Sequence, residues 1–163
     1  ILNKMNTPEI VIYTDGAAIG NPGPGGYGVV LKSGDYRKEL SQGYKLTTNN
    51  RMELMAVIAA LEALKIPNSN VKIYSDSKYV VDSVEKGWVF DWEKKHFKNK
   101  KNKDLWIKFL NLYRKHKVKM IWVKGHAHNP ENEYCDKLAV SAAKSNNLLD
   151  DKNYNEDNNN TLF

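Results

Sequence analysis

The chain has 163 residues, 41% of them hydrophobic and 27% charged, and a formal net charge of +6. This length and composition predict one domain that buries a core of its own. The single cysteine, Cys135, excludes an internal disulfide and a cysteine zinc site, and it fits a reducing compartment such as the cytoplasm. No apolar run approaches the roughly 18 residues of a membrane-spanning helix, and residues 1–9 lack the apolar segment of a signal peptide.

The first part of the chain predicts three strands and one helix. Residues 9–14 are rich in β-branched side chains and form the first strand. The glycine- and proline-rich residues 16–26 are expected to form only loop and turn. Residues 27–32 and 36–45 follow as two strands joined by a hairpin turn. From about residue 50 to residue 65 the chain is apolar nearly all round, which predicts a buried central helix.

The second part alternates strands and helices. Residues 71–75 and 118–123 predict the fourth and fifth strands, and residues 77–85, 104–116 and 130–145 predict helices. Three consecutive strands favour an antiparallel meander, whereas the strand–helix–strand crossings favour parallel additions to the same sheet. We therefore expect an α/β fold with one mixed five-stranded sheet, three antiparallel strands plus two parallel additions, flanked by helices.

The two ends of the chain are assigned to segments outside this domain. Residues 1–8 form an N-terminal extension, and the domain itself covers residues 9–145. Residues 146–163 are rich in asparagine and acids and lack periodicity, so we expect a disordered tail.

Charge is segregated along the chain. Residues 94–124 hold 12 Lys or Arg and one acid, so this stretch carries +11 and the rest carries −5. Such a basic segment indicates a polyanion partner, and a solvated, mobile loop is the competing interpretation. The densest part of this segment is residues 94–103, and the aromatic residues in or beside it are Trp88, Phe90, Trp92, Phe97 and Trp106. They favour a nucleic acid because lysines contact phosphates and flat rings stack on bases. Core packing is the alternative for those rings, and we expect one or two of them to be exposed.

Four acids lie where a single site could form. Asp15 follows the first strand, Asp76 follows the fourth, Glu53 sits in the first turn of the central helix, and Asp136 belongs to the last helix. In an open α/β sheet, ligand sites gather at the carboxyl ends of parallel strands. If the first and fourth strands are neighbours, Asp15 and Asp76 meet there.

Each acid also has a structural explanation of its own. Asp15 could form an Asx turn, Asn50 and Glu53 are spaced nearly as a capping box, Asp76 lies in an ordinary N-cap sequence, and Asp136 could face solvent. These explanations do not account for three acids that adjoin segments predicted to be buried.

Clustered carboxylates repel one another. Two unit charges 4 Å apart cost about 1 kcal/mol in water and about 4 kcal/mol at an intermediate dielectric. Such a cluster persists when a cation neutralises it or when some members stay protonated. Ligands that are all oxygen suit Mg²⁺ or Mn²⁺, and acidic ion sites beside a basic segment suggest phosphodiester chemistry.

Several motifs resemble those of bacterial ribonuclease H of type 1, in the family's order and near its spacings. The resemblance covers roughly residues 9–144 and is carried by T-D-G-A-A-I-G-N-P-G-P-G-G-Y-G (14–28), T-T-N-N-R-M-E-L-M-A (47–56), S-D-S-K-Y-V (75–80), D-L-W (104–106) and W-V-K-G-H-A-H-N-P-E-N-E-Y-C-D-K-L-A (122–139). It implies an endonuclease that hydrolyses the RNA strand of RNA–DNA hybrids with two Mg²⁺ ions, leaving 5′-phosphate and 3′-OH ends. Mn²⁺ is the alternative ion.

The resemblance also implies roles for the site residues. Asp15, Glu53, Asp76 and Asp136 would be the metal-binding acids, and Glu53 would also orient the attacking water. His126 would assist proton transfer and product release, with His128 as the competing candidate.

The implied substrate contacts lie on three segments. Asn21, Asn49 and Asn50 would read the minor groove of the hybrid, including 2′-hydroxyls. Thr48 and Asn102 would form a pocket for a DNA-strand phosphate. Leu46 stands where relatives often have a supporting arginine, which Arg51 could replace. Residues 88–104 correspond to the family's basic handle, which would contact the nucleic acid through Trp88, Trp92, Lys94, Lys95, Lys98 and Trp106.

Two other functions stay open. One is a catalytically silent hybrid-binding module, and the other is different phosphoryl transfer on the same fold, as in integrase-like enzymes. The full set of acids disfavours the first, and the hybrid-reading asparagines disfavour the second. We expect a monomer without an obligate protein partner or membrane contact.

Overall fold

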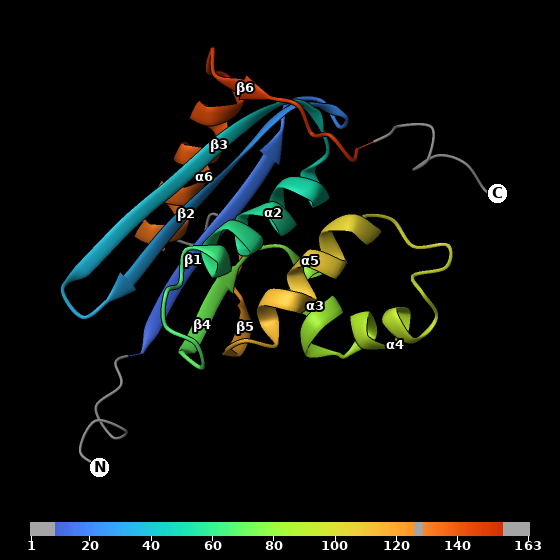
Figure 1. Cartoon of the computed structure of the whole chain (residues 1–163). Coiled ribbons are helices and arrows are strands. Elements are labelled where there is room, and N and C mark those ends of the chain that lie inside the picture. Colours follow the sequence, from blue (N-terminus) through green and yellow to red (C-terminus); the bar gives the residue numbers. More distant parts are fainter. Residues whose placement is uncertain (1–8, 126–128, 155–163) are drawn as a thin grey trace.

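The computed structural model describes residues 9–125 and 129–154. It contains one mixed sheet of six strands in the order β5-β4-β1-β2-β3-β6 (Figure 1). The β1–β2 and β2–β3 pairs are antiparallel, whereas β1–β4, β4–β5 and β3–β6 are parallel. The strands are β1 (Ile10–Ala18), β2 (Gly23–Ser33), β3 (Tyr36–Thr47), β4 (Asn70–Ser75), β5 (Lys117–Trp122) and β6 (Leu148–Leu149). The predicted α/β class and the mixed sheet are confirmed, with β6 as an additional strand.

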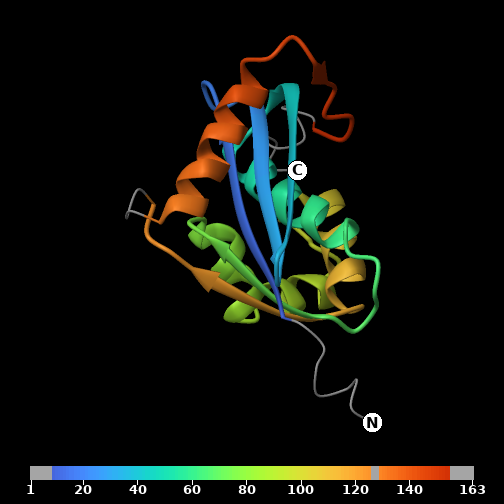
Figure 2. The same ribbon diagram turned by 90° about the vertical axis from the view of Figure 1, so that its left-hand side faces the viewer.

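Helices cover both faces of the sheet. Figure 2 shows α6 on one face and the other helices on the opposite face. The helices are α2 (Asn49–Glu62), α3 (Lys78–Glu85), α4 (Trp88–Lys94), α5 (Lys103–Tyr113) and α6 (Pro130–Ala143). None of the helices within residues 9–125 and 129–154 combines the length and apolar composition that crossing a membrane requires.

Helix α2 lies at the centre of the core, as its sequence predicts. Nine of its residues are buried, because β1 and β2 lie on one side of it and α5 on the other. Its N-cap is Thr48, whose hydroxyl accepts a hydrogen bond from the Arg51 backbone N–H. The cap is therefore not Asn50, and the capping box that would have explained Glu53 does not form.

The glycine-rich segment corrects the sequence interpretation. Residues 16–18 continue β1 and residues 23–26 begin β2, so only the short connection between them is a turn. The reason is close packing of helices on the sheet. A Cβ at Gly26 would lie 2.5 Å from the Ala139 carbonyl oxygen, and one at Gly28 would lie 2.3 Å from the Cys135 carbonyl oxygen. Glycine here allows α6 to contact the strand backbone.

The predicted disordered tail is wrong for residues 146–154. Leu148 and Leu149 form β6, which pairs with Gly43 and Tyr44 of β3. Asp151 then makes an ion pair with Arg51 at 2.7 Å, and its side chain is only 2% exposed. The buried ion pair and the backbone pairing with β3 order this segment although its composition is polar. Residues 1–8 and 155–163 lie outside the described residues.

The basic segment contains a helix and a tight turn. Helix α4 is followed by a turn in which His96, Phe97 and Asn99 have φ values between 55° and 59°. Phe97 is 5% exposed and fastens this turn to the core. The lysines of the turn are exposed, as the sequence predicts.

The close contact between β2 and α6 predicts the effect of adding one methyl group. Gly28→Ala places a Cβ among backbone atoms of α6, which cannot turn away as a flexible side chain would. We expect the free energy of unfolding to fall by about 1–3 kcal/mol, as in other overpacked cores. Denaturant unfolding measures this change, and an unaltered midpoint would contradict the packing described here.

Candidate active site

Three acidic side chains meet at one edge of the sheet. Asp15 lies near the end of β1, and Asp76 directly follows β4, the parallel neighbour of β1. Glu53 reaches the same place from α2. One carboxylate oxygen from each lies within 4.8 Å of the others, and Asp15 and Glu53 are buried. The predicted meeting of Asp15, Glu53 and Asp76 is therefore confirmed in the structure, although Asp15 lies within its strand rather than after it.

Glycine at position 16 makes this arrangement sterically feasible. A Cβ at Gly16 would lie 2.3 Å from the backbone nitrogen of Glu53 and from the carbonyl carbon of Met52. Strand β1 and helix α2 therefore touch through their backbones. That contact places the Glu53 carboxylate next to those of Asp15 and Asp76.

Asp136 belongs to the same hollow but stands apart from the tight cluster. It comes from α6, and its charge is one of those that raise the pKa of Asp15. The hollow lies between the end of the sheet and the start of α2 and α3. It is lined by Asp15, Gly16, Asn49, Asn50, Glu53, Asp76, Ser77, Lys78, Tyr79 and Asp136.

The cluster strongly perturbs the protonation of its members. Burial, followed by the charge of Asp76, raises the pKa of Asp15 to about 8. Burial and the charges of Asp15 and Asp76 also raise the pKa of Glu53 well above its ordinary value. Without a counter-charge, such a cluster holds protons near neutral pH.

The donor set fits a divalent cation. The Glu53 Oε1 atom is buried and has no hydrogen-bond partner among the described residues. Carboxylate oxygens close to one another, without thiolate or imidazole among them, match the ligands that hard cations prefer. The three acids could therefore hold a metal ion.

The predicted hybrid-reading asparagines lie beside the acids. The Asn21 side-chain oxygen accepts a hydrogen bond from the Asn49 backbone N–H at 3.1 Å. The Asn49 side-chain oxygen accepts one from the Ala18 backbone N–H at 2.6 Å. These bonds join the β1–β2 turn to the start of α2. Asn49 and Asn50 line the hollow and are exposed.

The structure contradicts a direct substrate contact by Arg51. Its side chain is 2% exposed and bound by two carboxylates, those of Asp104 and Asp151. Thr48 and Asn102 both contact it: the Thr48 hydroxyl accepts from its backbone N–H, and the Asn102 side-chain oxygen accepts from its Nη1 atom. Arg51 therefore contacts both predicted phosphate-pocket residues from the interior of the protein.

The aromatic residues of the handle divide into buried and accessible rings. Trp106 is fully buried, which contradicts a direct contact with nucleic acid, because its ring packs against Trp92 and Phe109. Trp92 is half-buried, with the Lys100 ammonium 5.0 Å from its ring centre. Trp88 is 44% exposed. Lys94, Lys95 and Lys98 are exposed as well.

Sequence reasoning missed two features around the acids. The Lys78 ammonium lies 4.6 Å from the ring centre of Trp122, whose indole N–H donates to the Asp76 carbonyl oxygen. The second missed feature is Asp151, which binds Arg51 and comes from a segment with no local sequence pattern. For Trp122, the one sequence signal is its position at the end of β5, just before the predicted histidine loop. His126 and His128 lie outside the described residues.

Comparison with protein families and curated sequences gives consistent matches. The RNase H family model matches residues 7–144. Ribonuclease H of Trichodesmium erythraeum is 59% identical over 151 residues, which cover 90% of this chain and 96% of the relative. Ribonuclease HI of a Synechocystis strain is 53% identical over 154 residues, covering 90% of this chain and 96% of the relative.

Solved structures show the same similarity. LC9-RNase H1, a type 1 RNase H with the type 2 active-site motif, superposes with a TM-score of 0.77 at 36% identity, over 84% of this chain and 72% of that one. LC11-RNase H1, solved in complex with an RNA/DNA hybrid, has a TM-score of 0.64 at 26% identity, over 82% and 96% of the two chains.

The raised pKa values predict a stability that depends on pH and on cations. The folded chain holds the Asp15 proton up to about pH 8, whereas an unfolded aspartate releases its proton near pH 4. The stabilisation from this group is therefore complete below about pH 4 and is lost as the pH rises through about 8. A cation replaces the proton, so millimolar Mg²⁺ should raise the melting temperature more at about pH 8 than at about pH 5.

Thermal unfolding at constant ionic strength tests this expectation, with Asp15→Asn as the comparison variant. The shift caused by Mg²⁺ should shrink in that variant, since one ligand and one negative charge are gone. A shift independent of pH, or equal in the two proteins, would contradict a cluster that exchanges protons for a cation.

Proposed function

The chain belongs to the RNase H family, as a type 1 ribonuclease H of the bacterial kind, and from that membership we propose which of its residues perform the reaction. The enzyme is an endonuclease that hydrolyses the RNA strand of RNA–DNA hybrids. The observation that carries the assignment of the site is the cluster of Asp15, Glu53 and Asp76 at the end of two parallel strands.

The cofactor is two Mg²⁺ ions, held by the cluster together with Asp136; Mn²⁺ is the alternative. When bound, the ions lower the pKa of a water molecule and stabilise the leaving oxygen. Asp15 and Asp76 would hold the ions beside the scissile phosphate. Glu53 orients the attacking water, and its unpaired Oε1 atom supports this role. The products carry 5′-phosphate and 3′-OH ends.

The neighbouring side chains recognise the hybrid. Asn21, Asn49 and Asn50 contact the minor groove, where 2′-hydroxyls distinguish RNA from DNA. Asn49 and Asn50 line the acidic hollow, and Asn21 is hydrogen-bonded to Asn49, which supports this role. Thr48 and Asn102 hold a phosphate of the DNA strand.

The handle supplies the remaining contacts with the hybrid. Trp88 lies against the nucleic acid, and the exposed lysines Lys94, Lys95 and Lys98 neutralise phosphates. His126 transfers a proton and assists product release, as an imidazole that titrates near neutral pH can do. The enzyme acts as a monomer in the cytoplasm.

A cleavage assay tests the reaction itself. Labelled RNA–DNA hybrid, double-stranded RNA, double-stranded DNA and single-stranded RNA are each incubated with Mg²⁺ or with EDTA. We expect cleavage of the hybrid's RNA strand alone, and none with EDTA. Binding of the hybrid without any cleavage would instead make the chain a recognition module.

The role of the acids is tested by Asp15→Asn, which keeps the shape of the side chain and removes its charge. We expect cleavage to fall by about a thousandfold or more, because a lost metal ligand removes several kcal/mol of transition-state stabilisation. Binding of the hybrid should survive, because its contacts lie elsewhere. Asp35→Asn, in the exposed β2–β3 turn, is the matched control. Equal loss of binding and cleavage would refute the assignment.

A further inference from the structure

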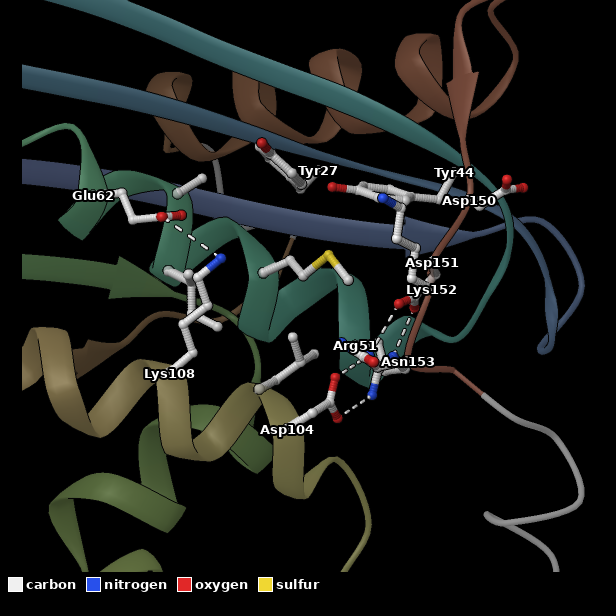
Figure 3. Close-up of a pocket in the computed structure, with 14 residues that line it drawn as sticks. Tyr27, Tyr44, Arg51, Glu62, Asp104, Lys108, Asp150, Asp151, Lys152 and Asn153 are labelled. Atoms are coloured by element: carbon white, nitrogen blue, oxygen red, sulfur yellow. Dashed lines mark hydrogen bonds and ion pairs between the residues drawn. The ribbon is translucent and has the colours of Figure 1, made fainter.

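Arg51 is the centre of a buried polar network that the reaction does not use directly. A guanidinium has five N–H donors, and each finds an acceptor here. Figure 3 shows the contacts of Arg51 with Asp104 and Asp151. Asp104 accepts from Nη1 and Nη2 at 2.9 and 2.7 Å, and Asp151 accepts from Nε and Nη2 at 2.7 and 3.0 Å. The fifth hydrogen bond runs from Nη1 to the Asn102 side-chain oxygen at 3.3 Å.

Asp151 reaches this network on a segment that crosses the sheet edge. We call residues 145–154 the C-terminal strap. Strand β6 fastens the strap to β3, and the Gln42 side chain donates to the Asn147 carbonyl oxygen. The Thr47 hydroxyl donates to Asp151 Oδ2 at 2.8 Å, the same oxygen that accepts from Arg51 Nε, and so helps to orient the carboxylate. The strap thus delivers one carboxylate to the start of α2.

The network determines how the Asn102 amide is oriented. Its oxygen accepts from Arg51, and its nitrogen donates to the Tyr79 hydroxyl at 3.0 Å. Tyr79 is fixed in turn by the Trp106 indole N–H at 2.8 Å. An amide nitrogen has two N–H donors, so one stays available for an anion while the amide oxygen faces the guanidinium. A flipped amide would present its oxygen to the anion and repel it.

We propose that Asp151 is a positioning residue for substrate binding, because it holds Arg51 in the one orientation that turns the Asn102 amide N–H toward a phosphate of the DNA strand. This inference rests on the proposed role of Asn102. Asp151 itself touches no substrate. In Asp151→Asn one carboxylate oxygen becomes an amide NH₂ group, so one N–H of Arg51, from Nε or Nη2, loses its acceptor and faces a donor instead. The guanidinium then turns toward Asp104 and releases Asn102.

Steady-state cleavage of a hybrid separates this role from simple stabilisation. Asp151→Asn should raise KM about ten- to a hundredfold, the size expected for one hydrogen bond to a charged group, while kcat stays close to that of the wild type. The matched control is Asp150→Asn. The Asp150 side chain is 71% exposed, and its ion pair with Lys45 is long, at 3.7 Å, so removing its charge should change little. Assays are run well below the melting temperature of each variant, which is measured in parallel.

Two further measurements decide whether the effect passes through Asn102. In a chain that already carries Asn102→Ala, adding Asp151→Asn should leave KM unchanged although it still lowers the melting temperature. In the Asp15→Asn background, hybrids with one neutral methylphosphonate linkage in the DNA strand should reveal a single linkage whose neutralisation weakens binding. That sensitivity should vanish in Asp151→Asn.

Each contrary result overturns the proposal in a distinct way. A lower melting temperature with unchanged KM would make Asp151 purely structural. A lower KM would mean that the freed Arg51 binds the phosphate itself. An unchanged KM for Asn102→Ala would show that Asn102 does not bind a phosphate, and the premise of the proposal would be lost. Failure of the wild-type chain to cleave any hybrid would contradict the proposed function, rather than the positioning role of Asp151.

Discussion

The structure depends on how closely helix α2 approaches strand β1. At Gly16 the two elements touch through backbone atoms, and this contact brings Glu53 to Asp15 and Asp76. Three carboxylates so close together repel one another, so the fold must supply an opposing free energy. Burial of the apolar side of α2 supplies it, since side chains such as Leu54 are fully buried in the same core. The free energy gained by burying the apolar core therefore offsets the repulsion among the three carboxylates.

Helix α2 serves several tasks because successive helical residues point in different directions. Asn50 faces solvent at the rim of the hollow, and Glu53 faces the acidic cluster. Arg51 turns instead into a buried ion-pair network with Asp104 and Asp151. A shift of the helix along its axis would disturb all three groups together. Substrate recognition, metal binding and stability are therefore coupled through the position of one helix.

Local patterns predicted the elements and the acids, because those signals lie within a few residues of one another. β-branched runs identified strands, and carboxylates beside strand ends identified the cluster. Contacts between distant segments leave no such signal. Gly26 lies in a glycine- and proline-rich run that predicts a loop, and no residue nearby in the sequence indicates its packing partner α6. Asp151 contacts Arg51 across 100 residues, and its polar surroundings resemble a disordered tail. Trp106 lies in a basic run, yet its ring is buried in the core.

Strand β3 forms the outer border of the antiparallel part of the sheet, and β6 pairs with only two of its 12 residues. An uncovered border offers free backbone N–H and C=O groups to any other extended chain. Here the uncovered part carries charged side chains at Arg37, Lys38 and Glu39, which oppose the approach of a second copy in register. Strand β6 covers one end of β3, and charged side chains occupy the other end. Together they protect this border against self-association. A chain that lost residues 146–154 would keep the charged end but expose Gly43 and Tyr44, and aggregation would begin there.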